Sequence, residues 1–288
     1  MYRLIRTIFL LGVIAALIGG GWAFYIYSTT DVEQLRGIID YVPPNQTQSR
    51  KAGLAHPDNA RLVDIPPELI FATFAAEDYD FAIHRGVRPG TIWTCIKGRL
   101  FHGAQCGGSS LTQQVVKNLL VGSEQTLYRK AKEMIVALKL ERHFTKADIF
   151  TLYANIAETG PGMYGYKQAA QLYFGKRLRE LTPVESAFIA SNLSAPTLRS
   201  RWYLEKSEDP KQVDFIKYIL FNALIFRTEL FSNDHVPAGF LAHDPFGDIA
   251  AHYDQIASSW TRYSQDEAMK EDVSEQVDRF VQRHLGVF

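Results

Sequence analysis

The segment 77–86, EDYDFAIHRG, opens the part of the chain that decides the fold, and it follows an apolar stretch that begins at Pro66-Pro67. Four further blocks come after it in order: GGSSLTQQVVKN at 107–118, RKAKE at 129–133, KADIFTLYAN at 146–155, and YG at 164–165 followed by AAQLYFGK at 169–176. These blocks are bordered by helix signals rather than by alternating strand patterns. The sequence therefore predicts a mainly α fold.

The same signals can be followed along the rest of the chain. Capping boxes and proline starts predict the beginnings of helices, and glycines predict several of their ends. The expected helices are Pro67 to Glu77, one opening at Ser110, 127–144, 146–157, 166–174 before Gly175, 183–193, 210–231, and a last one from Ser264 to Gly286. The segment 160–165 matches GxGxxG, but it follows a helical segment and contains proline, so it predicts a turn rather than a dinucleotide site.

Composition excludes several classes of protein. The 288 residues contain 31 Lys+Arg and 31 Asp+Glu, and a general nucleic-acid binder is usually basic overall. Two cysteines cannot form a disulfide scaffold or a four-cysteine zinc site. The histidines show no HExxH spacing, so a zinc enzyme is not expected.

The N-terminal segment is apolar enough to cross a membrane. Ile8 to Tyr27 forms the span, and no charged residue falls between Arg6 and Asp31. Twenty residues rising about 1.5 Å each cover about 30 Å, the thickness of a bilayer core. Basic residues precede the span, which predicts a cytoplasmic N-terminus. A signal peptide cleaved near Gly21-Trp22-Ala23 is the alternative, and we expect a single-pass anchor in residues 1–30.

Charge and composition divide the remaining chain. Residues 31–64 hold prolines and little periodicity, which is typical of a linker or extended neck. Residues 97–146 contain nine Lys/Arg against three Asp/Glu, and residues 264–279 contain six acidic against two basic residues. The basic stretch fits either a solvated helix face or anionic lipid head groups.

The five ordered blocks closely resemble the motifs of the family 51 glycosyltransferases. This family comprises the peptidoglycan transglycosylase domains of penicillin-binding proteins and the monofunctional transglycosylases. The resemblance covers roughly residues 60–196, and no S-x-x-K, S-x-N and K-T-G set follows it, so no transpeptidase domain is expected. It implies a lysozyme-like helical domain over 65–198 with a membrane-proximal jaw at about 87–120.

The resemblance implies polymerisation of lipid II into β-1,4 glycan strands, with inversion and release of undecaprenyl diphosphate. Glu77 ends an apolar helix where desolvation raises a carboxyl pKa, and we expect it to be the general base on the acceptor 4-hydroxyl. Glu133 is flanked by Arg129, Lys130 and Lys132 and is expected at the diphosphate end. There it would orient these cations or a divalent metal ion, Mg²⁺ or Mn²⁺.

Further residues are expected to bind substrate because a helix N-terminus favours phosphate. They are Ser110, Thr112, Gln113, Gln114, Lys117, Asn118, Arg129 and Lys130. For Ser110 and Gln113, helix capping alone is the alternative. His84 is expected to orient the loop rather than contact substrate, and Asn155 is expected to form a structural hydrogen bond at a helix end.

The jaw prediction leaves two questions open. Ile92 to Phe101 is either a segment that dips into the membrane interface or a small satellite core. Cys95 and Cys106 form either a disulfide, in an extracytoplasmic compartment, or two buried thiols. The chain also departs from the family at Arg88, at Thr94, and at Ser194 to Arg199, where an Asn-Pro motif is usual.

The resemblance places the protein in the bacterial cytoplasmic membrane with its catalytic domain outside. Lipid II, the nascent strand and the membrane are the expected partners. Residues 199–288 lie beyond the five blocks; they either pack onto the transferase domain or bind a partner such as a cell-wall synthesis protein. Two rival functions are a glycan hydrolase and a membrane-anchored assembly protein that binds glycan, and the survival of Glu77 and Glu133 counts against the second.

Overall fold

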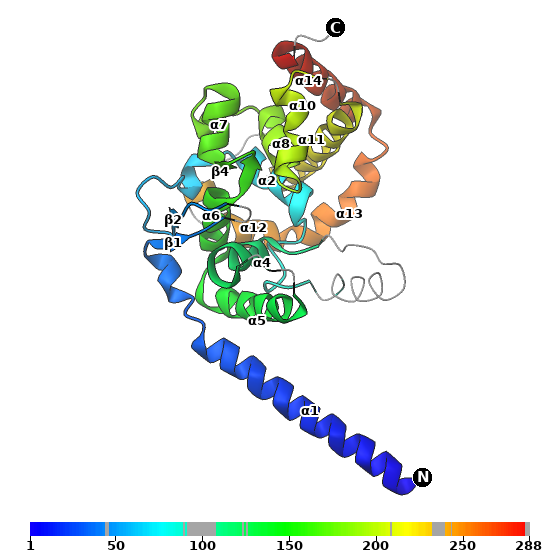
Figure 1. Cartoon of the computed structure of the whole chain (residues 1–288). Helices are drawn as coiled ribbons and strands as arrows, with labels where there is room; N and C mark the ends of the chain where they lie inside the picture. The colour runs from blue at the N-terminus through cyan, green and yellow to red at the C-terminus, as the bar shows by residue number, and fades with distance from the viewer. Residues whose placement is uncertain are drawn as a thin grey trace.

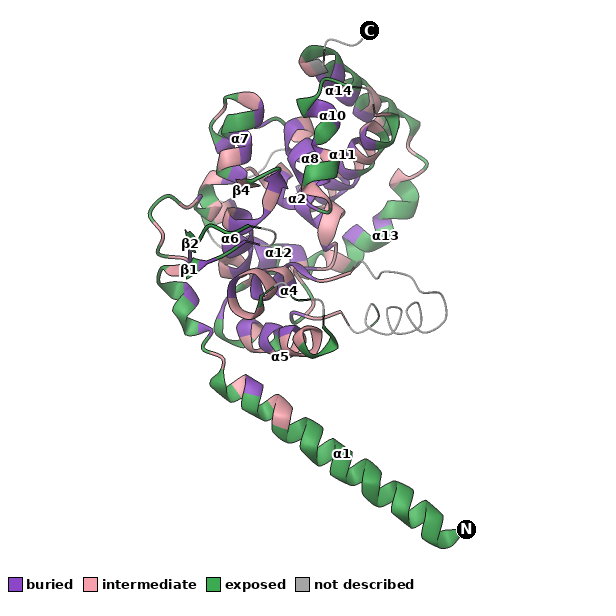
Figure 2. Ribbon diagram, viewed as in Figure 1, coloured by how far each residue is buried: buried purple, intermediate pink, exposed green. Residues whose placement is uncertain are grey.

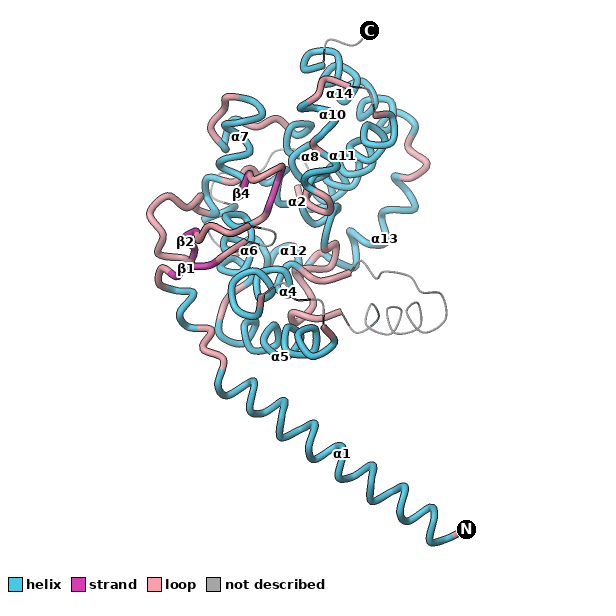
Figure 3. Tube along the Cα trace, in the orientation of Figure 1, coloured by secondary structure: helices cyan, strands magenta, loops and turns pink. Residues whose placement is uncertain are grey.

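The computed structural model describes residues 1–43, 46–88, 90, 108–122, 124, 126–207, 209–231, 240–242 and 244–285. The predictions made for Cys95, Cys106, Thr94 and the segment Ile92 to Phe101 fall outside these residues. Most of the described chain is helical, with two short hairpins (Figure 3). The expected mainly α, lysozyme-like domain preceded by one helix is confirmed.

The apolar N-terminal run forms one long helix, α1 (Tyr2–Thr29), which projects from the domain and is exposed along most of its length (Figures 1 and 2). It is long and apolar enough to cross a membrane. Its C-terminal end is docked: Ile26 is buried, and the Trp22 ring lies 5.3 Å from that of Tyr128. Lys139 Nζ donates to two carbonyls at this end, at 2.7 and 2.8 Å, and so satisfies groups that a helix end leaves unpaired.

The predicted neck, residues 31–64, is folded onto the domain rather than free. Its elements are η1 (Glu33–Arg36), β1 (Ile39–Tyr41), β2 (Arg50–Ala52) and η2 (Leu62–Asp64). The two strands pair antiparallel, with Ile39 opposite Ala52. Val32 and Leu35 are buried in the core. Removing their apolar side chains from water stabilises the folded position of the neck.

The helices that carry the five blocks follow in order, and two further helical segments come after the last block. They are α2 (Pro67–Glu77), α4 (Leu111–Val116), the π-helical η3 (Lys117–Val121), α5 (Leu127–His143), α6 (Lys146–Ile156), α7 (Tyr166–Phe174), η4 (Leu178–Glu180) and α8 (Pro183–Asn192). The predicted capping boxes at Ser110 and Thr182 are both formed. Gly175 ends α7 in the left-handed conformation, as predicted. Local capping chemistry thus fixes these boundaries.

The GxGxxG segment is a turn, as expected. It joins β3 (Glu158–Gly160) to β4 (Met163–Tyr164), which pair antiparallel. Gly162 and Gly165 adopt positive φ values of 69° and 86°. A Cβ on Gly165 would also lie 2.9 Å from the Asn155 carbonyl oxygen, so glycine is required there.

The C-terminal residues share the core of the domain. Their helices are α9 (Pro196–Arg199), α10 (Arg201–Leu204), α11 (Pro210–Leu230), η5 (Phe240–Ala242), α12 (Pro245–Ala251), α13 (Tyr253–Tyr263) and α14 (Glu267–Leu285). The Phe74 ring of α2 lies 5.9 Å from that of Phe226 on α11 and 6.0 Å from that of Phe246 on α12. Helix α11 packs against both α2 and α8 (Figure 1). Residues beyond 198 therefore help to hold the helix that ends in Glu77.

Candidate active site

Three helices bring most of the predicted site residues together. Glu77 is the last residue of α2, α4 follows the capping box at Ser110, and Glu133 lies in the second turn of α5. Gln113 Nε2 donates to Glu133 Oε1 at 3.1 Å, and Gln114 Nε2 donates to Glu77 Oε2 at 2.8 Å. Because consecutive helical residues point about 100° apart, Gln113 and Gln114 hold the two carboxylates in different directions from α4.

Glu133 is surrounded by donors. Its side chain is 1% exposed and forms ion pairs with Arg129 and Lys130 in addition to the bond from Gln113. Lys130 Nζ also donates to Ser109 Oγ at 2.7 Å. A buried carboxylate with two cationic partners fixes the direction of both cations.

Glu77 has a different environment. It is half-buried, and burial is the main cause that raises the pKa of its carboxyl above 4.5. The nearby Asp78 charge raises this pKa further, whereas the Gln114 hydrogen bond and the charges of Lys117 and Arg199 lower it. Its Oε1 atom is buried and has no hydrogen-bond partner among the described residues. One oxygen of this carboxylate is therefore held while the other remains able to accept a proton.

Lys117 directly follows α4, the helix that holds both carboxylates. It follows Gln113 by four residues and Gln114 by three, so it shares a helix face with both. The charges of Glu133 and Glu77 both act on it, while burial is the main cause that lowers its pKa below 10.5. The next residue, Asn118, has a buried Oδ1 without a partner in the described part of the chain. Both residues start the π-helical turn η3, a distortion often found at functional sites.

Two of the residues expected to bind substrate, Ser110 and Thr112, form hydrogen bonds within the protein. Ser110 is fully buried; its hydroxyl donates to the Gly86 carbonyl at 2.6 Å and accepts from Gln113 N. Thr112 is also fully buried and donates to Glu141 at 2.6 Å. Both hydroxyls thus stabilise the local structure around α4, and substrate binding by these two residues stays a prediction. For Ser110, the capping alternative is the one observed.

His84 lies in a polar cluster beside the site. Its Nε2 is 3.0 Å from Asp78 Oδ2, and its Nδ1 accepts from Gly86 N at 3.0 Å. Gly86 has a φ of 84°, and a Cβ there would lie 2.8 Å from the Ala137 carbonyl oxygen of α5. These contacts fit the loop-orienting role expected of His84. They also explain the spacing of histidine and glycine in this block.

The structure brings Asp78, Asp80 and His84 together, a set of side chains of the kind that could hold a metal ion. Several of their acceptor atoms already have partners in the protein. Asp78 is fully buried and accepts from Leu111 N at 2.8 Å, and the Arg88 guanidinium lies 3.6 Å from Asp78 and 3.3 Å from Asp80. Arg88, one of the departures from the family pattern, thus supplies the positive charge. Glu133 is likewise paired with Arg129 and Lys130, whereas Asp78, Asp80 and His84 form a set that could hold a metal ion.

Asn155 lies away from the two carboxylates. Its Oδ1 accepts from Ala60 N at 2.7 Å, and its Nδ2 donates to the carbonyls of Ala60 and Thr151 at 3.0 and 2.8 Å. The contact at the end of a helix agrees with the structural role expected of this residue. In addition, it ties α6 to the neck.

Arg199 was missed by sequence reasoning as a candidate residue. It lies at the end of α9, and its charge acts on Glu77. Its guanidinium stacks 4.2 Å from the Phe215 ring centre, its Nη1 donates to Gln212 Oε1 at 3.0 Å, and Gln212 Nε2 donates to Ser191 Oγ. The Nε atom is buried without a partner in the described residues. The only signal in the sequence was that Ser194 to Arg199 departs from the family pattern.

Comparison with known proteins agrees with this geometry. The penicillin-binding protein 1A of Escherichia coli (strain K12) is 34% identical over 206 residues, which are 68% of this chain and 24% of the relative. The proteins of the same name from Haemophilus influenzae and Rickettsia bellii are each 39% identical, over 155 and 199 residues. These cover 53% and 63% of this chain, and 18% and 25% of the relatives. The chain thus spans between about a fifth and a quarter of the length of these curated relatives. The family model described as "Transglycosylase" matches residues 47–217, and the chain belongs to this transglycosylase family.

Proposed function

We propose that this protein is a peptidoglycan glycosyltransferase that polymerises lipid II into β-1,4 glycan strands. The observation that carries the proposal is the pair of adjacent glutamines on α4, which hold Glu77 and Glu133 apart in contrasting environments. One carboxylate has a raised pKa and a free oxygen, and the other is saturated by cations. An inverting sugar transfer needs this separation of a base from the groups that receive the leaving group.

In the proposed reaction, Glu77 accepts the proton of the acceptor 4-hydroxyl. The hydroxyl oxygen then forms a bond to the anomeric carbon of the donor, and the bond from that carbon to the diphosphate breaks with inversion. The electron pair of the broken bond stays on the diphosphate oxygen. Arg129, Lys130 and Lys117 stabilise this charge, because preorganised cations in a partly buried site interact strongly with developing negative charge.

Glu133 acts in this scheme through the cations it holds. Its two oxygens fix Arg129 and Lys130 on either side, and Gln113 fixes Glu133 itself. Gln114 performs the corresponding task for Glu77. Asn118, whose amide oxygen is buried and unpaired among the described residues, is proposed to bind a donor hydroxyl at the same end.

The membrane anchor fits a lipid-linked substrate. The end of α1 is docked on α5, the helix that carries Glu133, Arg129 and Lys130. We propose that α1 spans the bacterial cytoplasmic membrane once, with its N-terminus in the cytoplasm. The domain then stands on the outer side, next to the surface where lipid II is presented.

Lipid II turnover by the full-length protein in detergent tests this function. The prediction is a ladder of lengthened glycan and release of undecaprenyl diphosphate. Shortening of preformed strands without lengthening of lipid II would establish a hydrolase. Bound but unreacted lipid II would favour the assembly protein. The presence of both Glu77 and Glu133 favours neither alternative. A parallel arm with a chelator tests Mg²⁺ and Mn²⁺, and because the acidic groups are saturated by side-chain cations, we expect residual polymerisation without added metal.

A further inference from the structure

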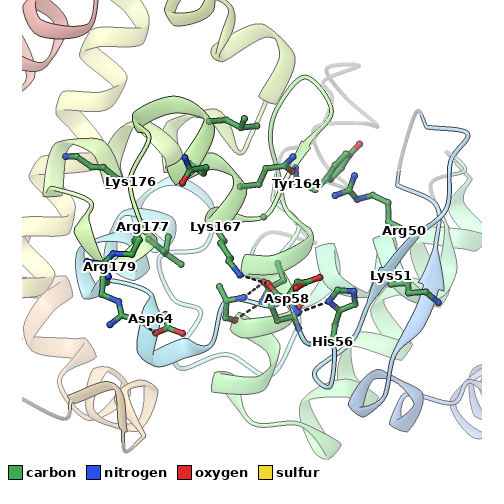
Figure 4. Close-up of a pocket in the computed structure, with 18 of the residues that line it drawn as sticks. Arg50, Lys51, His56, Asp58, Asp64, Tyr164, Lys167, Lys176, Arg177 and Arg179 are labelled. Carbon is green, nitrogen blue, oxygen red and sulfur yellow. Dashed lines mark hydrogen bonds and ion pairs between the residues drawn. The ribbon is translucent and has the colours of Figure 1, made fainter.

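A concave site lies between the neck and α7, separate from the two carboxylates. Its volume is about 690 Å³, within the range of pockets that hold small organic ligands (Figure 4). Neither Glu77 nor Glu133 lines it. We call it the basic pocket, after its charged lining residues Arg50, Lys51, Asp58, Asp64, Lys167, Lys176, Arg177 and Arg179.

The walls of the basic pocket are held in place by hydrogen bonds between side chains and backbone groups. Asn155, which lines it, is bonded to both backbone groups of Ala60 across the gap between α6 and the neck. On the opposite wall, Tyr164 N donates to Gln168 Oε1 at 2.9 Å and so fixes the start of α7. The pocket is therefore a preformed feature of the domain rather than a gap between mobile loops.

The charge of the lining is strongly one-sided. Six basic side chains face two acidic ones, a formal excess of four positive charges. Asp64 is already engaged, since Arg61 lies 2.9 Å and Arg179 3.1 Å from it. The lining thus has more positive charge than its own acidic groups can neutralise.

Two of the cations are available without breaking an ion pair. Arg50 and Lys167 have no carboxylate partner among the described residues. The Arg50 guanidinium lies 4.8 Å from the centre of the Tyr164 ring, and Lys167 Nζ donates to the Asp58 backbone carbonyl at 3.2 Å. Figure 4 shows the two residues on different walls, one from the neck and one from α7. Stacking on the Tyr164 ring holds the planar Arg50 guanidinium in place, and a fixed guanidinium is well suited to bind a carboxylate.

The ion pairs at the rim are easily exchanged. Those of Lys51 with Asp40 and of Arg177 with Glu180 are exposed to solvent, where such pairs contribute little to stability. A ligand with several negative groups can replace these partners at small cost. The uncharged lining adds the amides of Asn59, Gln168 and Gln171, which are suited to sugar hydroxyls.

We propose that the basic pocket binds the carboxylates of stem peptides on a finished glycan strand. The pocket combines multiple cations with amides, as an acidic carbohydrate requires. The identity of the ligand rests on the proposed function, because polymerisation of lipid II would produce such strands next to this domain. The basic pocket would retain the product strand outside the reaction site and so favour continued elongation.

Binding of soluble, uncrosslinked glycan strands to the full-length protein in detergent tests the proposal without any turnover. The variant Arg50→Glu with Lys167→Glu is compared with Lys211→Glu and Arg283→Glu, two exposed residues outside the pocket. We expect the pocket variant to bind strands at least about tenfold more weakly, because two charge-assisted contacts become repulsive. At low salt, the control variant should bind strands within about twofold of the wild type. The initial rate of lipid II polymerisation by the pocket variant should also match the wild type within about twofold.

Strands from which an amidase has removed the peptides are expected to bind as weakly as the pocket variant binds intact strands. Equal binding of intact and peptide-free strands, or of wild type and pocket variant, would overturn the proposal. So would binding to phosphatidylglycerol vesicles that depends on Arg50 and Lys167 when intact strands do not bind. Arg50→Gln with Lys167→Gln provides a milder version, and equal melting temperatures confirm that the variants fold.

The two proposals fail separately. If the wild type binds strands through the basic pocket but does not lengthen lipid II, the proposed function is wrong and the pocket assignment remains. If it lengthens lipid II but the pocket variant binds strands normally, only the pocket assignment is wrong.

Discussion

Replacing Glu133 by Gln tests whether this carboxylate holds the cations of the site together. Its side chain is 1% exposed, and the substitution leaves Arg129 and Lys130 facing an uncharged amide. Removing one partner of a buried ion pair costs about 3–5 kcal/mol. Arg129 is 14% and Lys130 38% exposed, so water screens part of this loss and we expect about 2–3 kcal/mol. For a domain of this size, this is a fall in Tm of about 4–12 °C.

Thermal unfolding of the full-length protein in detergent, followed by circular dichroism, measures this fall. Glu275→Gln is the matched control, because Glu275 forms an i,i+4 pair with Arg279 on α14 but is 58% exposed. Its Tm should change by less than about 2 °C. Equal melting temperatures for the two variants would refute the view that Glu133 is the buried centre of the site.

Three further outcomes follow from the contacts of the site. Because the pKa of Glu77 is raised above 4.5, activity should fall as pH decreases through that higher value. The substitution Gln114→Leu removes a hydrogen bond that lowers this pKa, so it should shift the acid limb of the pH–rate profile to higher pH. An acid limb that does not move in this variant would contradict the role of Gln114. Arg199→Gln should shift the limb in the same direction, whereas Arg201→Gln, which removes an exposed charge two residues away, should not. Asn155→Ala removes three hydrogen bonds and should lower stability by about 1–3 kcal/mol, with faster proteolysis of the neck; unchanged denaturant midpoints would rule out its tethering role.

The sequence predicted helix boundaries well because capping is local. Ser110 and Thr182 each form a hydrogen bond with a backbone group three residues away. Both partners therefore lie within a short stretch of sequence, and the residue types there are enough to predict the cap. The neck was less predictable. Its short strands pair only with each other, and its burial depends on contacts with helices far along the chain, such as that between Ala60 and Asn155.

The site shows the same limit. The blocks identified Glu77 and Glu133, and the spacing of Gln113, Gln114 and Lys117 agrees with where they lie. Which way Ser110 and Thr112 face was decided by tertiary packing: Gly86 and Glu141 take their hydroxyls, and neither partner is near them in sequence. Tertiary folding brings Arg199 and Arg88 near the site residues, so a local sequence pattern does not predict their role.

The initial rate of lipid II polymerisation by Glu77→Gln, beside wild type and Glu158→Gln, tests the central claim most directly. Glu158 lies on β3, and burial raises its pKa too, so it controls for loss of a partly buried carboxyl outside the site. The account predicts a loss of about 10²–10⁴-fold for Glu77→Gln and a nearly normal rate for Glu158→Gln, as general-base catalysis requires. A Glu77→Gln protein that lengthens lipid II at the wild-type rate would contradict it.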